Sequence, residues 1–335
     1  MTPPPSEHAW PPVTVVIPVK DWNEQVVECT RQCLKLDYPH FELWLIPDHL
    51  PPPPIQQQLD TWGDARLRIV HVGPAIAPVQ RNIGLSQCRT EIVAFSDSDA
   101  YPRPDWLKRA VPLLKDDVGA VGGPNLLPPL APWGERISDH VMRSPLGFGA
   151  AFVRHVPRPP HFINELPTCN LLVRRLPGCQ LPEHVQTGDD MVFCANIRAR
   201  GMKILYDPDV VVFHHRRTIF KPLLTQFFFY GLFKGVLARS RHTASHLWNA
   251  APAAWVLVLL ALVPVCHLLH TPWPLLPALL YLVAILLESL RTSHSLRDLL
   301  PTLAAFCLCH LSYGIGYWRG LLHPPTSAPL FSFLK

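Results

Sequence analysis

Residues 91–99 read Glu-Ile-Val-Ala-Phe-Ser-Asp-Ser-Asp, an apolar run that ends in two closely spaced carboxylates. A short apolar run of this kind is typical of a strand buried on both faces. Asp97 and Asp99 follow it directly, with Ser98 between them. Such a pair can hold Mg²⁺ or Mn²⁺, which prefer oxygen ligands and commonly share coordination with phosphates. An acidic surface turn is the alternative for an isolated Asp-x-Asp, but the position after a buried strand favours a metal site.

Further strand and helix patterns alternate on both sides of this stretch. The alternation predicts an α/β fold with a mainly parallel, doubly wound sheet and right-handed crossovers, in which ligands collect at the carboxyl ends of the strands. Asp21 and Glu24 form a capping-box pattern at the start of the first helix. The predicted strands are 13–17, 41–46, 67–72, 91–95, 118–121 and 169–174, with extended structure at 203–213. The predicted helices are 21–36, 80–88, 104–115 and 188–200. Residues 50–54 are predicted as an exposed polyproline turn and residues 128–167 as an irregular functional loop region.

The chain becomes strongly apolar in its last third. Residues 251–269 and 273–290 have few charges and approach the roughly 20 residues that a bilayer requires. A third apolar segment at 299–322 is interrupted by His310 and Arg319, so a re-entrant or interfacial helix is an alternative to a span. Residues 220–237 combine aromatic side chains with lysines, which predicts a helix in the membrane interface, with a packed core helix as the alternative.

Charge and cysteine content limit the class and location of the protein. Lys and Arg flank the first two apolar segments but are absent between them, so the positive-inside rule predicts a multi-pass cell-membrane protein with a cytoplasmic soluble domain. A formal charge of +5 is mild and favours a membrane surface rather than nucleic acid. The nine cysteines lack metal-finger spacing, which predicts reduced, buried thiols. No basic segment leads into an apolar run at the Pro-rich start, so no secretory signal is expected.

Several segments, taken in order, resemble the family 2 glycosyltransferases. The resemblance covers roughly residues 12–217 and implies the GT-A nucleotide-binding fold, with inversion of configuration at the anomeric carbon. The segments that carry it are 13–20, Gln80-Arg-Asn-Ile-Gly-Leu85, Phe95-Ser-Asp-Ser-Asp99, 169–175, and Gly188-Asp189-Asp190 with Tyr206-Asp-Pro208 and His214 behind it.

The resemblance assigns metal and donor contacts to two of these segments. Asp97, Ser98 and Asp99 correspond to the family's metal and diphosphate motif, with Asp99 preferred as the direct metal ligand. Arg81 and Asn82 correspond to an Arg-Asn pair near the nucleotide, although an ordinary helix is the alternative for this segment.

Two further positions are assigned to donor binding. Pro18 lies in the first matching segment, and Asp48 lies where many members place a carboxylate near the nucleobase. Pro47 and His49 replace the usual neighbours of that carboxylate, so the identity of the base is left open.

The Gly188-Asp189-Asp190 segment resembles the motif whose last acidic residue acts as the general base. An acceptor hydroxyl must lose its proton as it attacks, and a carboxylate within hydrogen-bond reach can take it. We therefore predict catalysis by Asp190, and helix capping or acceptor orientation by Asp189. His214 or His215 is predicted to reach the metal or a phosphate, with a purely structural role as the alternative.

These patterns predict a membrane-anchored inverting glycosyltransferase. It would use Mn²⁺ or Mg²⁺ to move a sugar from a UDP- or GDP-sugar to a hydroxyl or phosphate of a lipid-linked or envelope glycan acceptor. The alternatives are a catalytically inactive nucleotide-sugar-binding or assembly subunit, and a nucleotidyltransferase, for which no Gly-rich phosphate loop is visible. The predicted boundaries are a disordered Pro-rich N-terminus at 1–11, the GT-A domain at 12–217, an interfacial amphipathic segment at 218–245, about three membrane helices at 246–323 and a tail at 324–335.

Overall fold

The computed structural model describes residues 10–184, 188–239, 247–293 and 295–323. The chain divides into two compact units, of which unit 1 comprises residues 1–128 and 156–214, and unit 2 comprises residues 129–155 and 215–335. The predicted boundary at residue 217 remains a prediction, but residues 129–155 belong to the unit that holds the C-terminal helices. The predicted tail, most of the predicted N-terminal segment and the end of the 218–245 segment lie outside the described residues.

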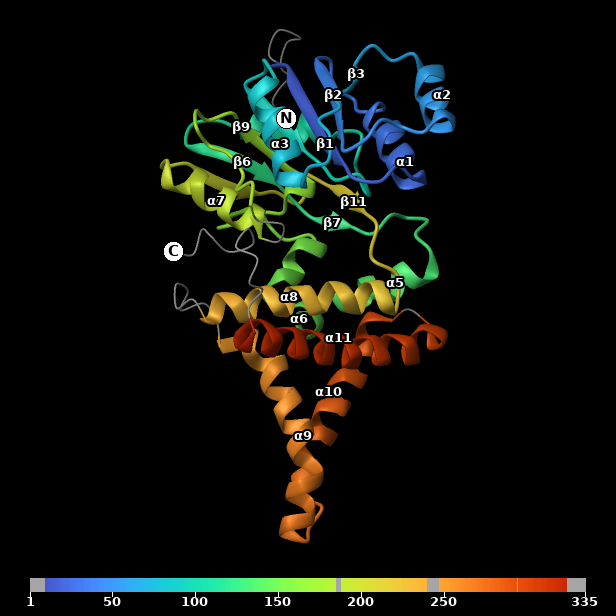
Figure 1. The fold of residues 1–335 in the computed structure, drawn as a ribbon, viewed down its shortest axis with the longest axis vertical. Coiled ribbons are helices and arrows are strands. Elements are labelled where there is room, and N and C mark those ends of the chain that lie inside the picture. The colour runs from blue at the N-terminus through green and yellow to red at the C-terminus, as the bar shows by residue number, and fades with distance from the viewer. Residues whose placement is uncertain (1–9, 185–187, 240–246, 294, 324–335) are drawn as a thin grey trace. The chain divides into compact units, whose positions relative to one another are not determined.

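An eight-stranded mixed sheet forms the centre of unit 1 (Figure 1). Its strands are β1 (Val13–Val19), β2 (Phe41–Pro47), β3 (Leu67–Ile69), β4 (Ile92–Phe95), β6 (Val118–Gly122), β8 (His161–Phe162), β9 (Leu171–Arg174) and β10 (Lys203–Tyr206), in the order β3-β2-β1-β4-β9-β6-β10-β8. The pairs from β3 to β4 and the β6–β10 pair are parallel, whereas β9 and β8 run antiparallel to their neighbours. The predicted mainly parallel α/β sheet is therefore confirmed.

Both faces of β1 are covered, which explains its uninterrupted apolar sequence. Val15 and Ile17 pack with residues of α1 (Glu24–Cys33) and α4 (Trp106–Ala110) on one face. Val16 packs on the other face with residues of α3 (Ala77–Gln87) and α7 (Asp189–Ala199), because successive side chains of a strand point to opposite faces. β1 lies between β2 and β4, so the order of strands along the sheet reverses there. Ligands of open α/β sheets bind at such switch points.

A second, three-stranded sheet continues from the end of β4. It consists of β5 (Ala100–Pro102), β11 (Val212–His214) and β7 (Asn125–Leu126), in the order β5-β11-β7. β5 and β11 are antiparallel, and their register places His214 opposite Ala100. This pairing brings a residue near the end of unit 1 beside the turn that follows β4.

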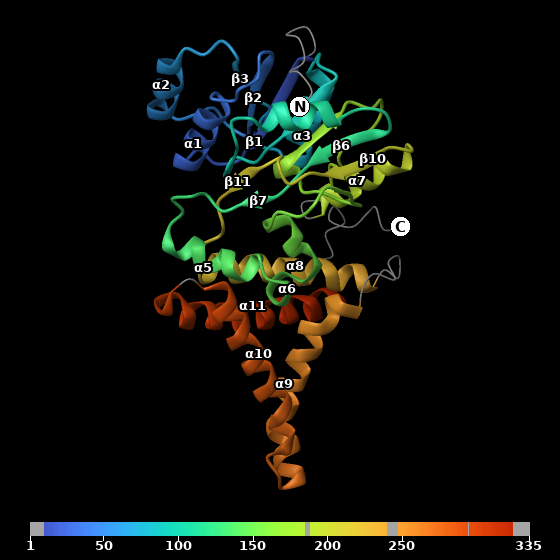
Figure 2. The ribbon, with the colours of Figure 1, turned by 180° about the vertical axis from the view of Figure 1, so that it is seen from behind.

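Unit 2 is helical. Its helices are α5 (Trp133–Met142), α6 (Pro145–Phe148), α8 (Lys221–Arg239), α9 (Ala251–Leu269), α10 (Leu276–Thr292) and α11 (Leu296–Leu322). Three segments are long and apolar enough to cross a membrane, namely Trp248–Leu269, Trp273–Thr292 and Leu296–Leu322. These segments support association of the chain with a membrane. Figures 1 and 2 show α8 and α11 side by side, with α9 and α10 projecting from them as a hairpin.

Local turn and cap predictions were wrong in two places. Helix α2 (Pro53–Trp62) begins inside the predicted polyproline turn, since proline is well tolerated in the first turn of a helix. The capping residue of α1 is Asn23 and not Asp21, because the Asn23 side chain accepts the backbone N–H of Val26 at 3.1 Å.

Two longer predictions were also wrong. The predicted helix at 104–115 is α4 followed by a 3₁₀ turn at Val111–Leu113, where Pro112 cannot continue the α-helical bonding. Much of the predicted irregular region at 128–167 forms α5, α6 and the 3₁₀ segment Gly149–His155. Within unit 2, Trp133 Nε1 donates to Asp298 Oδ1 at 2.8 Å, a contact that no local pattern reveals.

Candidate active site

The turn after β4 presents the two carboxylates of the Asp-Ser-Asp motif. The Asp97 carbonyl accepts the backbone N–H of Ala100 at 3.1 Å, which closes a tight turn with Ser98 and Asp99 inside it. The same carbonyl accepts the Cys29 thiol of α1 at 3.4 Å. A hydrogen bond with Cys33 and burial raise the pKa of the Cys29 thiol well above its usual value, so this thiol remains a donor. The turn is therefore fixed from both sides.

His214 completes a three-residue cluster at this turn. Because β11 pairs with β5, His214 Nε2 lies 3.2 Å from Asp99 Oδ1. One ligand atom from each of Asp97, Asp99 and His214 lies within 4.8 Å of the others, and all three residues are half-buried. Two carboxylate oxygens and one imidazole nitrogen fit Mn²⁺ or Mg²⁺, with positions left for phosphate oxygens. The predicted metal ligands are thus brought together.

The neighbours of His214 hold its ring in a charged environment. Burial lowers the pKa of His214, but the Asp99 carboxylate and the Cys169 thiol outweigh burial and raise the pKa to about 10. Without a metal, the imidazolium therefore neutralises part of the carboxylate charge. As a metal ligand, the ring has to be neutral.

Arg81 joins the Asp-Ser-Asp turn to the start of α7. Its guanidinium contacts Asp97 Oδ1 at 2.5 Å and Asp189 Oδ2 at 3.1 Å, and its side chain is only 6% exposed. Burial lowers the pKa of Arg81, but the two carboxylates outweigh burial and raise it. The buried Nε has no hydrogen-bond partner among the described residues. A single buried cation thus holds two acidic motifs together across the mouth of the sheet.

The first turn of α7 separates the roles of its two aspartates. Gly188, with φ of 84°, occupies the N-cap position and has no side chain with which to cap the helix. The Asp189 carboxylate contacts Arg81 at this helix start, and its predicted role in helix capping or acceptor orientation remains a prediction. Burial raises the pKa of Asp189 to about 6, against the opposing effect of Arg81. Asp190 Oδ1 accepts the backbone N–H of Met191 at 2.8 Å, so its carboxylate lies beside the same helix start.

Asn82 fixes the segment that leads toward α7. Its Nδ2 donates to the Leu181 carbonyl at 2.9 Å and to Glu183 Oε1 at 3.0 Å, and its Oδ1 accepts the Leu181 N–H at 2.8 Å. The predicted nucleotide contact remains a prediction. The contacts that the structure shows make Asn82 a positioning residue.

Asp48 lies at the end of β2, and Gln80 of α3 holds it there. Gln80 Nε2 lies 2.8 Å from Asp48 Oδ1, 2.8 Å from the Ile46 carbonyl and 3.2 Å from the Val19 carbonyl. Sequence reasoning missed this role of Gln80, although a polar residue at a buried helix position was the available signal. Pro18 is buried inside β1 and pairs in register with Ile46, and its predicted role in donor binding remains a prediction.

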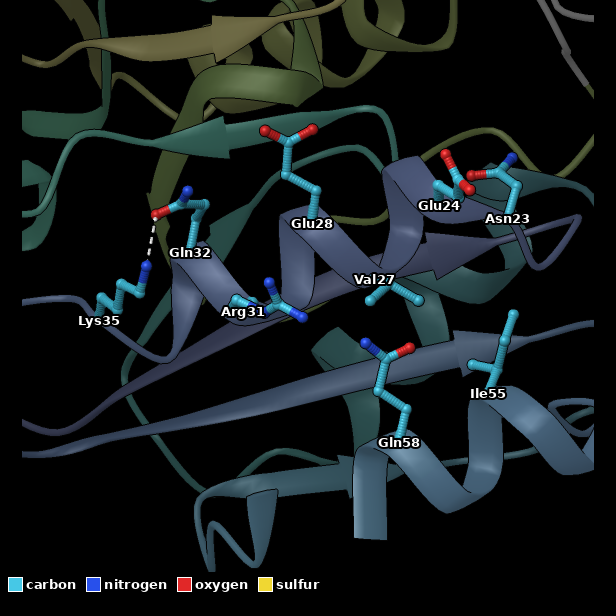
Figure 3. A pocket seen from close by; sticks show the side chains of 9 residues that line it. All are labelled: Asn23, Glu24, Val27, Glu28, Arg31, Gln32, Lys35, Ile55 and Gln58. Carbon is cyan, nitrogen blue, oxygen red and sulfur yellow. Dashed lines mark hydrogen bonds between the residues drawn. The ribbon is translucent and has the colours of Figure 1, made fainter. Parts of the chain in front are cut away.

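A separate groove of about 690 Å³ lies between α1 and α2 (Figure 3). Val27 and Arg31 of α1 line one side, and Ile55 and Gln58 of α2 line the other. None of the predicted site residues lines this groove. It is therefore distinct from the acidic cluster at the end of β4.

Part of the chain matches a known protein family. Residues 14–164 match the model of glycosyl transferase family 2. Pre-mycofactocin glycosyltransferase of Mycobacterium tuberculosis is 28% identical over 165 residues, which make up 48% of this chain and 33% of that protein. The chain therefore spans about a third of the length of that relative.

Two further proteins are similar over more of their length. The dolichyl N-acetyl-alpha-D-glucosaminyl phosphate 3-beta-D-2,3-diacetamido-2,3-dideoxy-beta-D-glucuronosyltransferase of Methanococcus voltae is 22% identical over 258 residues, covering 72% of this chain and 74% of the relative. The solved structure of mannosyltransferase PcManGT from Pyrobaculum calidifontis, in complex with GDP-Man and Mn²⁺, has a TM-score of 0.56 and 18% identity, and the alignment covers 95% of this chain and 89% of that one. Residues 14–164 therefore match a glycosyl transferase family 2 domain, and the mostly parallel mixed sheet with its helices resembles the GT-A fold.

Proposed function

We propose that this chain transfers a sugar, with inversion, from a nucleoside-diphosphate sugar to an acceptor on a membrane-held molecule. The observation that carries the proposal is the Arg81 bridge, which joins the Asp-Ser-Asp turn to the helix start that bears Asp190. A family 2 domain supports the reaction class. Donor phosphates at Asp97 and Asp99 would then lie close to a base at Asp190.

Asp97, Asp99 and His214 would hold a divalent metal ion, Mn²⁺ or Mg²⁺. Support comes from their mutual distances and from the Mn²⁺ in the Pyrobaculum mannosyltransferase complex. A bound ion supplies positive charge that stabilises the departing nucleoside diphosphate. The protein's part is to fix the ligands, which it does through the turn at Ala100 and the register of β11 with β5.

Asp190 would take the proton from the acceptor hydroxyl as that oxygen attacks the anomeric carbon. Asp189 is engaged with Arg81 and so holds the helix start in place. Asp190 lies at the same helix start, where its Oδ1 accepts the backbone N–H of Met191, and a carboxylate at this place could take the proton of an acceptor hydroxyl.

A lipid-linked acceptor suits this chain best. Three segments of unit 2 are apolar enough to cross a membrane, and the Methanococcus relative acts on a dolichyl-phosphate-linked sugar by its name. Anchoring the enzyme and acceptor in one bilayer raises the effective concentration of the acceptor. We place the domain matched by family 2 on the cytoplasmic side. Arg239 precedes the first span and Arg291 lies at the end of the second, and the positive-inside rule assigns such positively charged flanks to the cytoplasm.

The test uses the full chain in lipid nanodiscs with extracted membrane lipids as acceptors. A panel of UDP- and GDP-sugars is supplied with Mn²⁺, Mg²⁺ or a chelator, and both nucleoside diphosphate and lipid-extractable sugar are measured. We expect metal-dependent transfer that is lost in Asp99→Asn and kept in the exposed control Asp209→Asn. Release of pyrophosphate would indicate a nucleotidyltransferase, and donor binding without turnover would indicate an inactive binding subunit; either result contradicts the proposal.

A further inference from the structure

Both ends of α11 are tied to parts of unit 2 that precede the first span. Near its start, Asp298 Oδ1 accepts Trp133 Nε1 of α5 at 2.8 Å. Near its end, the Leu321 carbonyl accepts Arg239 Nη1 of α8 at 3.2 Å. Helices α5 and α8 both come before α9, and neither is among the described segments apolar enough to span, so the two helices lie on the same side of the membrane. The two ends of α11 contact these helices and therefore lie on that side as well.

We propose that α11 lies flat in the membrane interface beside α8, and that α9 and α10 alone cross the bilayer as a hairpin. Length and composition allow α11 to span, but its contacts do not. The proposal goes beyond the proposed function and does not depend on it, because it concerns only how unit 2 meets the lipid.

Glycines hold α8 and α11 together as a close parallel pair. A Cβ on Gly231 would lie 2.0 Å from the Tyr313 carbonyl oxygen, and one on Gly316 would lie 2.1 Å from the Phe228 carbonyl oxygen. Such contacts mean that backbone meets backbone, as in small-xxx-small helix pairs. The pattern repeats one turn further along at Gly235 against Tyr317 and at Gly320 against Leu232. Because these contacts extend over much of α8, α11 cannot leave α8 to cross the membrane without breaking them.

Burial distinguishes α11 from the two spans. Within the most apolar window of each segment, 6% of Trp248–Leu269 and 17% of Trp273–Thr292 is buried, against 33% of Leu296–Leu322. Protein covers one face of α11, and its exposed large apolar residues are Leu296, Leu300, Leu308, Ile315 and Leu322. A helix with lipid on one side and protein on the other fits the interface. Far fewer residues of α9 and α10 are buried, as expected for helices surrounded largely by lipid.

The distribution of positive charge agrees with this arrangement. Arg297 lies in the first turn of α11 and Arg319 in its last turn, and both are exposed. If α11 crossed the membrane, one of the two would be carried to the far side. The turn between α9 and α10 contains no Lys or Arg, as the positive-inside rule requires for the far side.

Epitope accessibility tests the topology in the full chain. One epitope is placed before Met1, one after Thr271 in the turn between α9 and α10, and one after Lys335, each in a separate protein. In oriented membrane vesicles we expect the first and third epitopes to bind antibody from the same side, and the second from the opposite side. Binding of the Lys335 epitope from the side of the Thr271 epitope would overturn the proposal, and so would binding of all three from one side.

Depth measurements test the orientation of α11 directly. Nitroxide side chains are introduced in the full chain at the exposed positions Leu300, Leu308 and Ile315 through unnatural amino acids, and their contact with oxygen and with a water-soluble nickel complex is measured. We expect the three depths to agree within about one helical turn, or ~5 Å. Leu257 and Leu268 of α9 are the matched controls, and should differ by about 16 Å at ~1.5 Å per residue. A change of about 22 Å between Leu300 and Ile315, as in a span, would overturn the proposal.

Discussion

Replacing Arg81 with Met should destabilise unit 1 strongly. The Arg81 side chain is 6% exposed and contacts Asp97 at 2.5 Å and Asp189 at 3.1 Å. Met retains much of the apolar volume but leaves both carboxylates without their cation. Breaking a buried ion pair in this way costs about 3–5 kcal/mol. At about 2–4 °C per kcal/mol for a unit of roughly 150–250 residues, the unfolding midpoint should fall by about 6–20 °C.

Thermal unfolding of the full chain in nanodiscs, followed by tryptophan fluorescence with a chelator present, measures this shift. Arg68→Met is the matched control, because Arg68 and Glu42 form an ion pair at 2.8 Å with side chains 56% and 39% exposed. Exposed pairs contribute about 0–1 kcal/mol, so the control should fall by no more than about 4 °C. Equal shifts in the two variants would refute the reasoning, because burial of Arg81 would then make no difference.

Three further predictions concern helix packing, the α7 segment and pH. Gly316→Leu places side-chain atoms where a Cβ already meets the Phe228 carbonyl at 2.1 Å. The thermal midpoint of this variant should fall by at least the equivalent of about 1–3 kcal/mol, whereas the midpoint of the exposed control Ile315→Leu should change little. Asn82→Ala leaves buried backbone groups unpaired, so unfolding should become easier by about 1–3 kcal/mol; an unchanged midpoint would contradict the positioning role. Burial raises the pKa of Asp189 from 3.8 to about 6, so the free energy of unfolding of the parent chain should decline as pH rises between these values and then level off. Chemical unfolding from pH 4 to 8 measures this, and Asp189→Asn should lack the decline. A rise in place of the decline would mean that Arg81 outweighs burial.

The strands of unit 1 could be predicted because their cause is local. β1, β2 and β4 are buried on both faces, so each is a short apolar run that the sequence displays directly. The position of Asp97 and Asp99 at a strand end follows from the same pattern. Their approach to His214 does not, since it depends on the pairing of β11 with β5; the resemblance to a family supplied that expectation.

Contacts between distant segments could not be predicted. Arg81 and Asp189 are 108 positions apart, and no periodicity links them. Helix α5 was missed because its stability comes from unit 2, where Trp133 bonds to Asp298 across 165 positions. The sequence also left open whether the third apolar segment spans, because its glycines become informative only when α8 is seen against them.

The most direct test of the central claim separates metal binding from proton transfer at one site. Mn²⁺ binding, measured by electron paramagnetic resonance, and sugar transfer are compared in the parent chain and in its Asp99→Asn and Asp190→Asn variants. We predict that Asp190→Asn binds Mn²⁺ and donor like the parent protein yet loses transfer by at least about 100-fold, and that Asp99→Asn loses Mn²⁺ binding. Transfer by Asp190→Asn within about tenfold of the parent rate, well inside the effect of a general base, would contradict the account.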